Sequence, residues 1–232
     1  MIISEHKYFV SIFISTTLIF VVLSYGCSKT HNNSSVADND TTLMTEPADI
    51  IPEPSIIIDC NYSFAGAIAG TQAPDSVTNQ LVLLNVQYFS TDGKVHQGQI
   101  LCSQEIEKGI VEIFKFMFEQ KFPVAKAIPI VKYGWDDHRS MADNNTYSFC
   151  YRDVSYSKHA SGMAIDINPF FNPVRYKNDS IVYRSEPIGA KYDPDIPGTF
   201  TEKSFVVQKF RDLGFRWGHT FRTKFDDHHF EK

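Results

Sequence analysis

The sequence predicts an α+β fold, in which a small antiparallel sheet carries its helices packed on one face. Two β-rich runs at 81–89 and 94–101 flank Asp92-Gly93, a pair typical of a hairpin turn. Two stretches, at about 103–120 and 201–213, have apolar residues at helical spacing. A short apolar run follows Gly162 and is typical of a third strand. Residues 56–232 are enough for one well-buried domain and too few for two.

The first helix is expected to begin with Ser103 as its N-cap and to end before Pro123. Its apolar stripe indicates packing on the sheet and consists of Ile106, Ile110, Ile113, Phe114 and Met117. A short strand is predicted at 127–133, and another at 147–152 that ends in Arg152. The polar stretch between them contains Asp136, Asp137 and Arg139, and we interpret its two carboxylates as structural.

The segment 169–198 is rich in Pro, Tyr, Asn and Asp and has only a brief β-like patch at 181–183. We expect it to cross the surface and to form a wall of the substrate groove, as long ordered loops beside a site often do. The second helix is predicted from Thr201 or Glu202 to Leu213, with Gly214 as its C-cap. Its predicted buried stripe is Phe205, Val206, Phe210 and Leu213.

The first 27 residues are typical of an export signal. An apolar run at 9–23 has the size of a signal-peptide core and is short for a membrane span. The sequence Ser24-Tyr25-Gly26-Cys27 resembles the lipobox of bacterial lipoproteins, although Tyr25 departs from the strict pattern. This resemblance implies an exported protein that is lipid-anchored to the bacterial cell envelope through Cys27. The alternative is an uncleaved N-terminal anchor.

Residues 28–55 have the polar composition of a disordered tether. One lysine and five carboxylates give the tether a net charge of −4, and Glu5 cancels Lys7. The net charge of −5 for the chain therefore leaves about −1 for 56–232. No basic field exists to gather nucleic acid, so we exclude that class of partner. Cysteines 60, 102 and 150 allow one disulfide in an exported protein, and no Cys-x-x-Cys pair indicates a thiolate metal site.

Two potential metal ligands lie close together in the middle of the chain. His159 offers an imidazole and Asp166 a carboxylate, and Gly162 permits a tight reversal between them. In the strand that follows, alternation places Asp166 and Asn168 on the face opposite Ile165 and Ile167. The polar face is expected to line a cleft. A surface turn followed by an ordinary strand is the competing interpretation of this segment alone.

A second motif near the C-terminus offers a further potential metal ligand and a further carboxylate. A catalytic zinc needs three protein ligands, an open position for water and a nearby carboxylate that takes the proton from that water. The sequence Asp226-Asp227-His228-His229-Phe230 offers a carboxylate and a histidine three residues apart. Adjacent residues on an extended strand point to opposite faces, so only one of the two histidines is expected to reach the metal.

Together the two motifs, S-x-H-x-x-G-x-A-x-D and D-x-x-H-F, resemble those of the zinc peptidases that include VanY-type D-alanyl-D-alanine carboxypeptidases and L-alanyl-D-glutamate endopeptidases. The similar stretch runs from about residue 80. The resemblance implies a hedgehog/DD-peptidase-like fold, zinc as the cofactor, His159, Asp166 and His229 as its ligands, and Asp226 as the catalytic carboxylate. It also implies that an arginine ahead of the first motif binds substrate or the oxyanion; Arg152 fits that place, and Arg139 is the rival.

The remaining candidates are weaker. His228 is the alternative ligand, His219 stands where related peptidases commonly have a glycine, and we interpret His219 as a non-ligand. Trp217 is expected to pack under the last strand rather than to stack on substrate, and Cys150 is a minor candidate for a nucleophile.

The resemblance and the predicted export imply peptidoglycan stem peptides as substrates of a monomeric enzyme, cut as a D,D-carboxypeptidase or as an L-Ala-D-Glu endopeptidase. The alternatives are a non-catalytic zinc-containing module that binds cell wall or protein, and a structural lipoprotein whose motifs match by accident.

Overall fold

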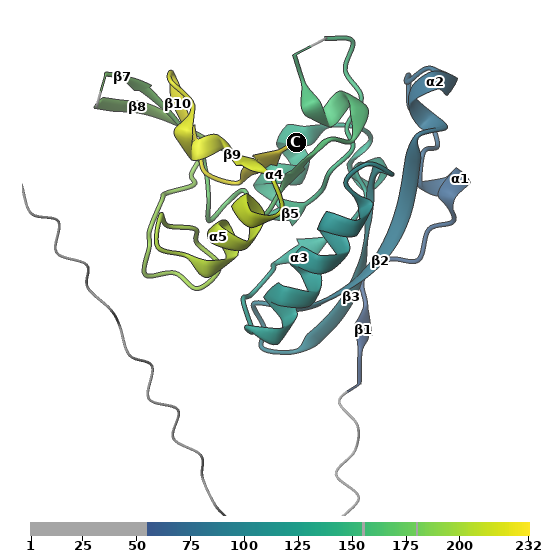
Figure 1. Ribbon diagram of the computed structural model, residues 1–232, viewed down its shortest axis with the longest axis horizontal. Coiled ribbons are helices and arrows are strands. Elements are labelled where there is room, and N and C mark those ends of the chain that lie inside the picture. The colour runs from purple at the N-terminus through teal and green to yellow at the C-terminus, as the bar shows by residue number, and fades with distance from the viewer. Residues whose placement is uncertain (1–54, 155, 180) are drawn as a thin grey trace, which may run out of the picture. The chain divides into compact units, whose positions relative to one another are not determined.

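The chain is described by a computed structural model at residues 55–154, 156–179 and 181–232. The predicted signal segment with Cys27, and the tether except for Ser55, lie outside the described residues. Within the described ranges, no helix is long and apolar enough to cross a membrane. Short helices and small sheets alternate along the chain, which agrees with the predicted α+β class (Figure 1).

The predicted hairpin is confirmed. Strand β2 (Leu81–Phe89) pairs antiparallel with β3 (Val95–Ser103) over nine residues. At the turn, Gly93 adopts a φ of +79° and the Lys94 N–H donates to Oδ1 of Asp92 at 2.9 Å. Strand β1 (Ile57–Ile58) adds to β3 in parallel, which completes a three-stranded sheet in the order β1-β3-β2.

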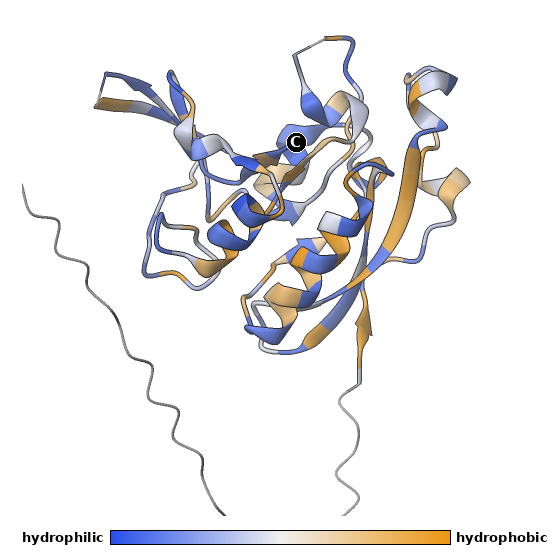
Figure 2. Cartoon of the chain, in the orientation of Figure 1, coloured by the Kyte–Doolittle hydropathy of each residue, from blue (hydrophilic) through white to orange (hydrophobic). Residues whose placement is uncertain are grey.

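Helix α3 (Glu107–Glu119) packs on this sheet, and α5 (Phe205–Asp212) packs on α3 and on a second sheet (Figures 1 and 2). Helix α3 begins later than predicted because Ser103 is the last residue of β3 and Ile106 takes the N-cap position. Phe205 was predicted to be in the buried stripe of this helix, but it is 62% exposed, whereas Val207, which was not predicted to be there, is buried. The two helices share one core, built from Ile110, Ile113, Phe114, Met117, Val206, Val207 and Phe210.

The second sheet has the order β6-β11-β9, with β6 at Ala164–Asp166, β11 at His229–Glu231 and β9 at Arg216–Trp217. Phe230 pairs with Ile165, and both side chains are fully buried in the helix-covered core. Their neighbours His229 and Asp166 form the next cross-strand pair and project to the opposite face. Helices therefore cover one face of this sheet and polar ligands lie on the other, as predicted. The single sheet predicted from the sequence is instead divided among four small sheets.

The segment at 169–198 contains more β-structure than its composition indicated. Strands β7 (Val174–Asn178) and β8 (Ile181–Glu186) form a hairpin, and β10 (Lys224–Asp226) pairs with β7. In Figure 1 this hairpin projects from the rest of the described chain. The sheet β10-β7-β8 therefore connects the surface segment to the C-terminal motif.

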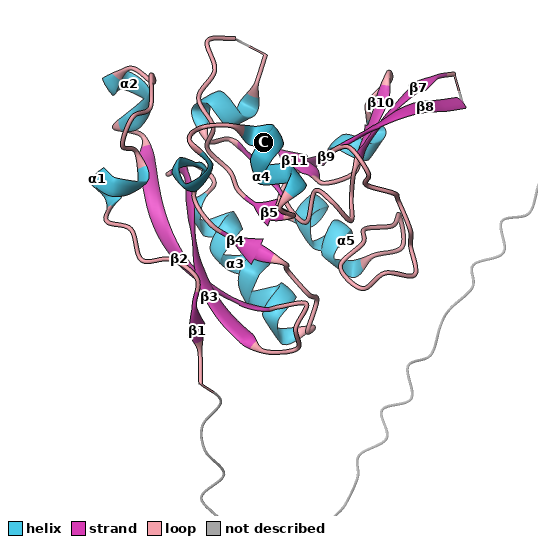
Figure 3. Ribbon diagram, turned by 180° about the vertical axis from the view of Figure 1, so that it is seen from behind, coloured by secondary structure: helices cyan, strands magenta, loops and turns pink. Residues whose placement is uncertain are grey.

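The strand predicted at 127–133 is wrong. Only β4 (Lys126–Ala127) is extended, and the 3-10 helix η1 (Ile130–Tyr133) begins after Pro129, which has no N–H to donate to a strand ladder. Helix α4 (Asp137–Ala142) follows, with Asp136 as its cap. The strand predicted at 147–152 is also misplaced: β5 (Asn145–Thr146) pairs in parallel with β4 (Figure 3), and Tyr147 adds one isolated bridge to Asp166.

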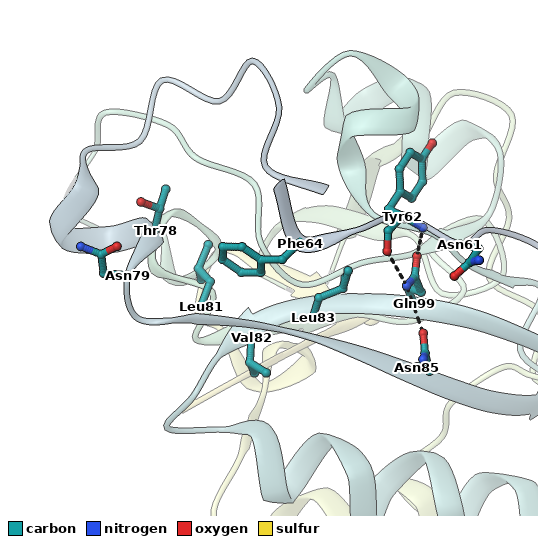
Figure 4. Close-up of a pocket in the computed structure, with 10 residues that line it drawn as sticks. All are labelled: Asn61, Tyr62, Phe64, Thr78, Asn79, Leu81, Val82, Leu83, Asn85 and Gln99. Atoms are coloured by element: carbon teal, nitrogen blue, oxygen red, sulfur yellow. Dashed lines mark hydrogen bonds between the residues drawn. The ribbon is translucent and has the colours of Figure 1, made fainter. Parts of the chain in front are cut away.

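Of two short helices, α1 (Phe64–Ala67) packs beside β2, and α2 (Asp75–Thr78) lies at the end where β2 begins. The Gln99 side chain holds this region: it accepts from the Tyr62 N–H at 2.7 Å and donates to the Tyr62 carbonyl and to Asn85 (Figure 4). The three cysteines of the described ranges are free thiols, so the disulfide that the sequence allowed does not form among them. Cys102 and Cys150 are buried.

Candidate metal centre

A glycine turn positions the first candidate ligand. His159 lies in the 3-10 helix η2 (Lys158–Ser161), which ends at Gly162 with a φ of +70°. The Gly162 carbonyl accepts from the Ser103 N–H at 2.9 Å, so the turn is attached to the end of β3. A Cβ on Gly162 would lie 2.7 Å from the Ser103 nitrogen, too close for any side chain. The turn therefore needs glycine for its backbone angle and for space.

Three donor atoms converge where this turn meets the last strand. Nε2 of His159 lies 3.1 Å from Oδ1 of Asp166 and 3.0 Å from Nδ1 of His229. Nδ1 of His229 lies 3.0 Å from the same oxygen of Asp166. One ion at the usual zinc distances of about 2.0–2.2 Å can contact atoms spaced this closely. The structure thus brings together the three residues that the sequence motifs single out as ligands.

In His159 and His229, the ring nitrogen that points away from the other two ligands is hydrogen-bonded to an oxygen of the protein. Nδ1 of His159 lies 2.6 Å from the Ser148 carbonyl, and Nε2 of His229 lies 3.2 Å from Oε2 of Glu231. Each of these nitrogens is assigned as the N–H donor, because the facing oxygen can only accept. A neutral ring that donates from one nitrogen presents a lone pair at the other. Two imidazole lone pairs and a carboxylate oxygen therefore face one point, a donor set that fits zinc.

The close contact of these histidines with carboxylates shifts the pKa values of His229 and Asp166. Burial lowers the pKa of His229, but hydrogen bonds to Asp166 and Glu231 outweigh burial and raise it to about 10. Burial raises the pKa of Asp166, and the charges of His159 and His228 reverse that effect and hold it well below its usual range. In the protein without metal, a proton on His229 thus takes the place of the cation that the three donors need.

Asp226, the candidate base, is the last residue of β10, and 7% of its side chain is exposed. Its Oδ2 accepts from Nζ of Lys224 at 2.7 Å. Its Oδ1 is buried, and among the described residues no donor is aligned for a hydrogen bond to it; Nε2 of His228 lies 3.2 Å away but out of line. Burial raises the pKa of Asp226, but the charges of His228, His229 and Lys224 lower it overall. The carboxylate is therefore ionised with one acceptor oxygen free.

These groups line one cavity of about 570 Å³. Arg152 reaches it, with NH2 donating to Oδ2 of Asp137 at 2.6 Å, whereas the rival Arg139 is absent from the lining. Asp137 thus has the structural role expected of it, with Arg152 as its partner. The surface segment contributes to the wall of this cavity through three residues, Val174, Tyr176 and Glu186.

The other histidines differ in part from expectation. His228 was expected to point away from the metal, but it lies in a turn rather than on a strand, and its Nε2 is 3.6 Å from Oδ2 of Asp166. His219 lies outside the ligand group and contacts Oδ1 of Asp227 at 2.6 Å through Nδ1. Trp217 is 1% exposed and stacks near Phe230, so its predicted packing under the last strand is confirmed. Burial raises the pKa of Cys150 to about 11, which disfavours a nucleophile.

Three residues beside the candidate site were not singled out from the sequence. Glu231 and Lys224 each lie two positions from a motif residue on the same strand, so the two-residue period of a strand places each side chain beside its partner. That signal was available once the strands were assigned. Asp227 is fully buried, but it occupies an unspecified position of the D-x-x-H-F motif, which assigns a role only to Asp226.

A family model described as D-alanyl-D-alanine carboxypeptidase matches residues 152–232, about a third of the chain. The match confirms the resemblance seen in the motifs, and it begins later than the predicted residue 80. It includes all five predicted site residues, namely Arg152, His159, Asp166, Asp226 and His229. No curated protein and no solved structure matched the chain.

Proposed function

We propose, from the match of residues 152–232 to a peptidase family, that this protein is a zinc peptidase that hydrolyses peptidoglycan stem peptides. The family match supports a hydrolase. The metal, the substrate and the residue roles below are our proposal, and the cavity chemistry supports them.

One observation carries the proposal. The buried Oδ1 of Asp226 has no hydrogen-bond partner among the described residues, and it lines the same cavity as the three converging ligand atoms. A buried carboxylate oxygen without an aligned hydrogen-bond donor is costly unless a donor reaches it in the working state. A water molecule beside the metal would donate its proton to this oxygen, as a catalytic zinc site requires.

When bound, zinc would act as a Lewis acid toward water and toward the scissile carbonyl. His159, Asp166 and His229 would hold it, with Ser148 and Glu231 fixing the two rings. Oδ1 of Asp226 takes the proton from the attacking water and later gives it to the leaving amine. Lys224 holds the other oxygen of Asp226, which orients the carboxylate during both transfers.

Arg152 is suited to bind a carboxylate or the developing oxyanion. One of its terminal nitrogens is used by Asp137, but 39% of the side chain is exposed and the guanidinium has five N–H groups. If Arg152 binds the free C-terminal carboxylate, the enzyme removes terminal D-Ala. If it stabilises the oxyanion within a longer peptide, the bond is that between L-Ala and D-Glu.

The test is incubation of the purified, zinc-analysed protein with defined stem peptides, followed by mass spectrometry of the products. Loss of a terminal alanine identifies a carboxypeptidase, and cleavage after the first L-Ala identifies an endopeptidase. One zinc per chain without cleavage of any stem peptide would contradict the proposal and favour the non-catalytic binding module. Absence of bound zinc would favour an accidental motif match.

We also propose that Cys27 anchors the protein to the bacterial envelope by a lipid. The proposal rests on the lipobox-like sequence alone, because this segment lies outside the described residues. Mass spectrometry of the N-terminal peptide tests it: an acylated Cys27 is expected, and an unmodified peptide beginning at Met1 would indicate the uncleaved anchor.

A further inference from the structure

Asp227, the neighbour of the candidate base, forms a buried ion pair with Arg175 and also contacts His219. Its side chain is fully buried, with Oδ2 2.6 Å from Nε of Arg175 and Oδ1 2.6 Å from Nδ1 of His219. Removing charges from water is costly, so a buried pair adds little net stability compared with apolar packing. A documented use of such pairs is to select one arrangement of the chain over another.

Both partners of Asp227 are fixed by aromatic rings. The Arg175 guanidinium lies 4.0 Å from the Tyr192 ring centre and 4.7 Å from that of Phe225. The His219 ring stacks between Trp217 and Phe225, at 4.4 and 4.7 Å. A movement of either donor would break these aromatic contacts, so the contacts oppose a shift of the donors with the turn. Only one position of Asp227 satisfies both.

The turn itself leaves little freedom. Asp226 ends β10 and His229 begins β11, so two residues connect the candidate base to the candidate ligand. A Cβ on Gly218 would lie 2.7 Å from the Asp226 Cβ and 3.1 Å from that of His229, so the turn packs closely on the preceding segment. Trp217 Nε1 also donates to the Asp227 carbonyl at 2.8 Å.

Because Asp226 and Asp227 are adjacent and identical in type, either carboxylate could face the cavity, and the ion pair of Asp227 favours Asp226. A shift of one residue would place Asp227 where Asp226 stands, and His228 would then face Arg175 and His219 in place of a carboxylate. We infer that Asp227 is a positioning residue: held between Arg175 and His219, it fixes the register in which Asp226 and His229 both face the metal site. The inference rests on the proposed peptidase function and adds a residue that touches neither metal nor substrate.

The test compares Asp227→Asn with the control Asp212→Asn, which changes an exposed carboxylate on α5. For Asp227→Asn we expect kcat to fall about 10- to 100-fold with KM within about threefold. We expect zinc affinity, measured by chelator competition, to fall about tenfold. The absorption spectrum of the cobalt-substituted protein should change as well. The control should leave all four quantities unchanged.

A double variant, Arg175→Met with Asp227→Leu, separates positioning from stability. It replaces the buried pair by apolar side chains and should recover the unfolding midpoint of the parent, because such replacements are often tolerated. Under the inference it does not recover kcat or zinc affinity. Recovery of both together with the midpoint would overturn the inference, as would a folded Asp227→Asn with parental kcat and zinc affinity. If the parent protein cleaves no stem peptide, the proposed function fails, while zinc affinity and the cobalt spectrum still decide the role of Asp227.

Discussion

Nε2 of His159 and Nδ1 of His229 lie 3.0 Å apart, while the opposite nitrogen of each ring is bound by a carbonyl or a carboxylate. Seventy residues separate the two histidines in sequence. These two nitrogens and the Asp166 oxygen are thus brought together by the fold itself, with a proton on His229 in the place of the cation when no metal is bound. The predictions below follow from this arrangement and from the carboxylate beside it.

Asp226→Ala is expected to keep one zinc per chain and to lose about 10²- to 10⁴-fold in kcat, because the proton acceptor is removed and the ligands are not. His159→Ala should instead lose the metal. Zinc analysis and turnover of both purified variants check this difference. A fully active Asp226→Ala protein would rule out the assignment of the base.

Glu231→Gln should weaken zinc binding about 10- to 100-fold, because the carboxylate that accepts from Nε2 of His229 fixes the ring and increases its basicity. Chelator competition measures the change. Glu105→Gln is the matched control, since Glu105 is exposed and is not among the residues that line the cavity. Equal affinities in the two variants would show that Glu231 does not support the ligand.

Zinc affinity should increase by about tenfold per pH unit between about pH 6.5 and 9. The pKa of His229 in the metal-free protein is raised from 6.5 to about 10, so zinc must displace one proton in this range. The same shift stabilises the metal-free fold fully below pH 6.5, and this stabilisation is lost as the pH rises through 10. Chelator competition and unfolding of the metal-free protein across pH measure the two effects; a flat affinity profile would contradict the assignment.

Lys224→Met should move the acid limb of the kcat/KM profile to higher pH. The Lys224 ammonium is one of the charges that lower the pKa of Asp226, so its removal raises that pKa and leaves less ionised base in acid. Activity at pH 5 is expected to fall several-fold more than at pH 8. Lys224→Arg keeps the charge and should restore the limb. An unchanged limb in Lys224→Met would show that Lys224 does not tune the base.

Gly162→Ala should destabilise the fold by about 1–3 kcal/mol and weaken zinc binding, because a positive φ and a contact of 2.7 Å with the Ser103 nitrogen oppose any Cβ. Thermal unfolding and chelator competition measure both. Gly93→Ala, at a hairpin turn with a positive φ but open space, is the comparison and should affect only stability.

The sequence predicted the structure correctly where neighbouring residues determine it, as in a hairpin turn or in the alternation of a strand. Asp92-Gly93 gave the hairpin, and alternation after Gly162 placed Asp166 opposite Ile165. It was less informative where tertiary contacts decided. The β7–β8 hairpin is stabilised by β10 from the far end of the chain, and the strand expected at 127–133 is broken by Pro129 and replaced by η1. The orientation of His228 was predicted wrongly because the alternation of a strand was applied to a turn. Asp227 was missed because its contacts with Arg175 and His219 depend on the tertiary fold and leave no pattern in the sequence.

The pairing of β11 with β6 has a consequence for biosynthesis. Because His229 reaches Asp166 only after the last strand has been made and has paired, the nascent chain has two of the three ligands and no base while residues 167–225 emerge. Zinc capture must therefore follow completion of this strand. Under the proposed export of an unfolded chain, this pairing would follow passage across the membrane, and the metal would be supplied by the compartment of destination and not by the site of synthesis.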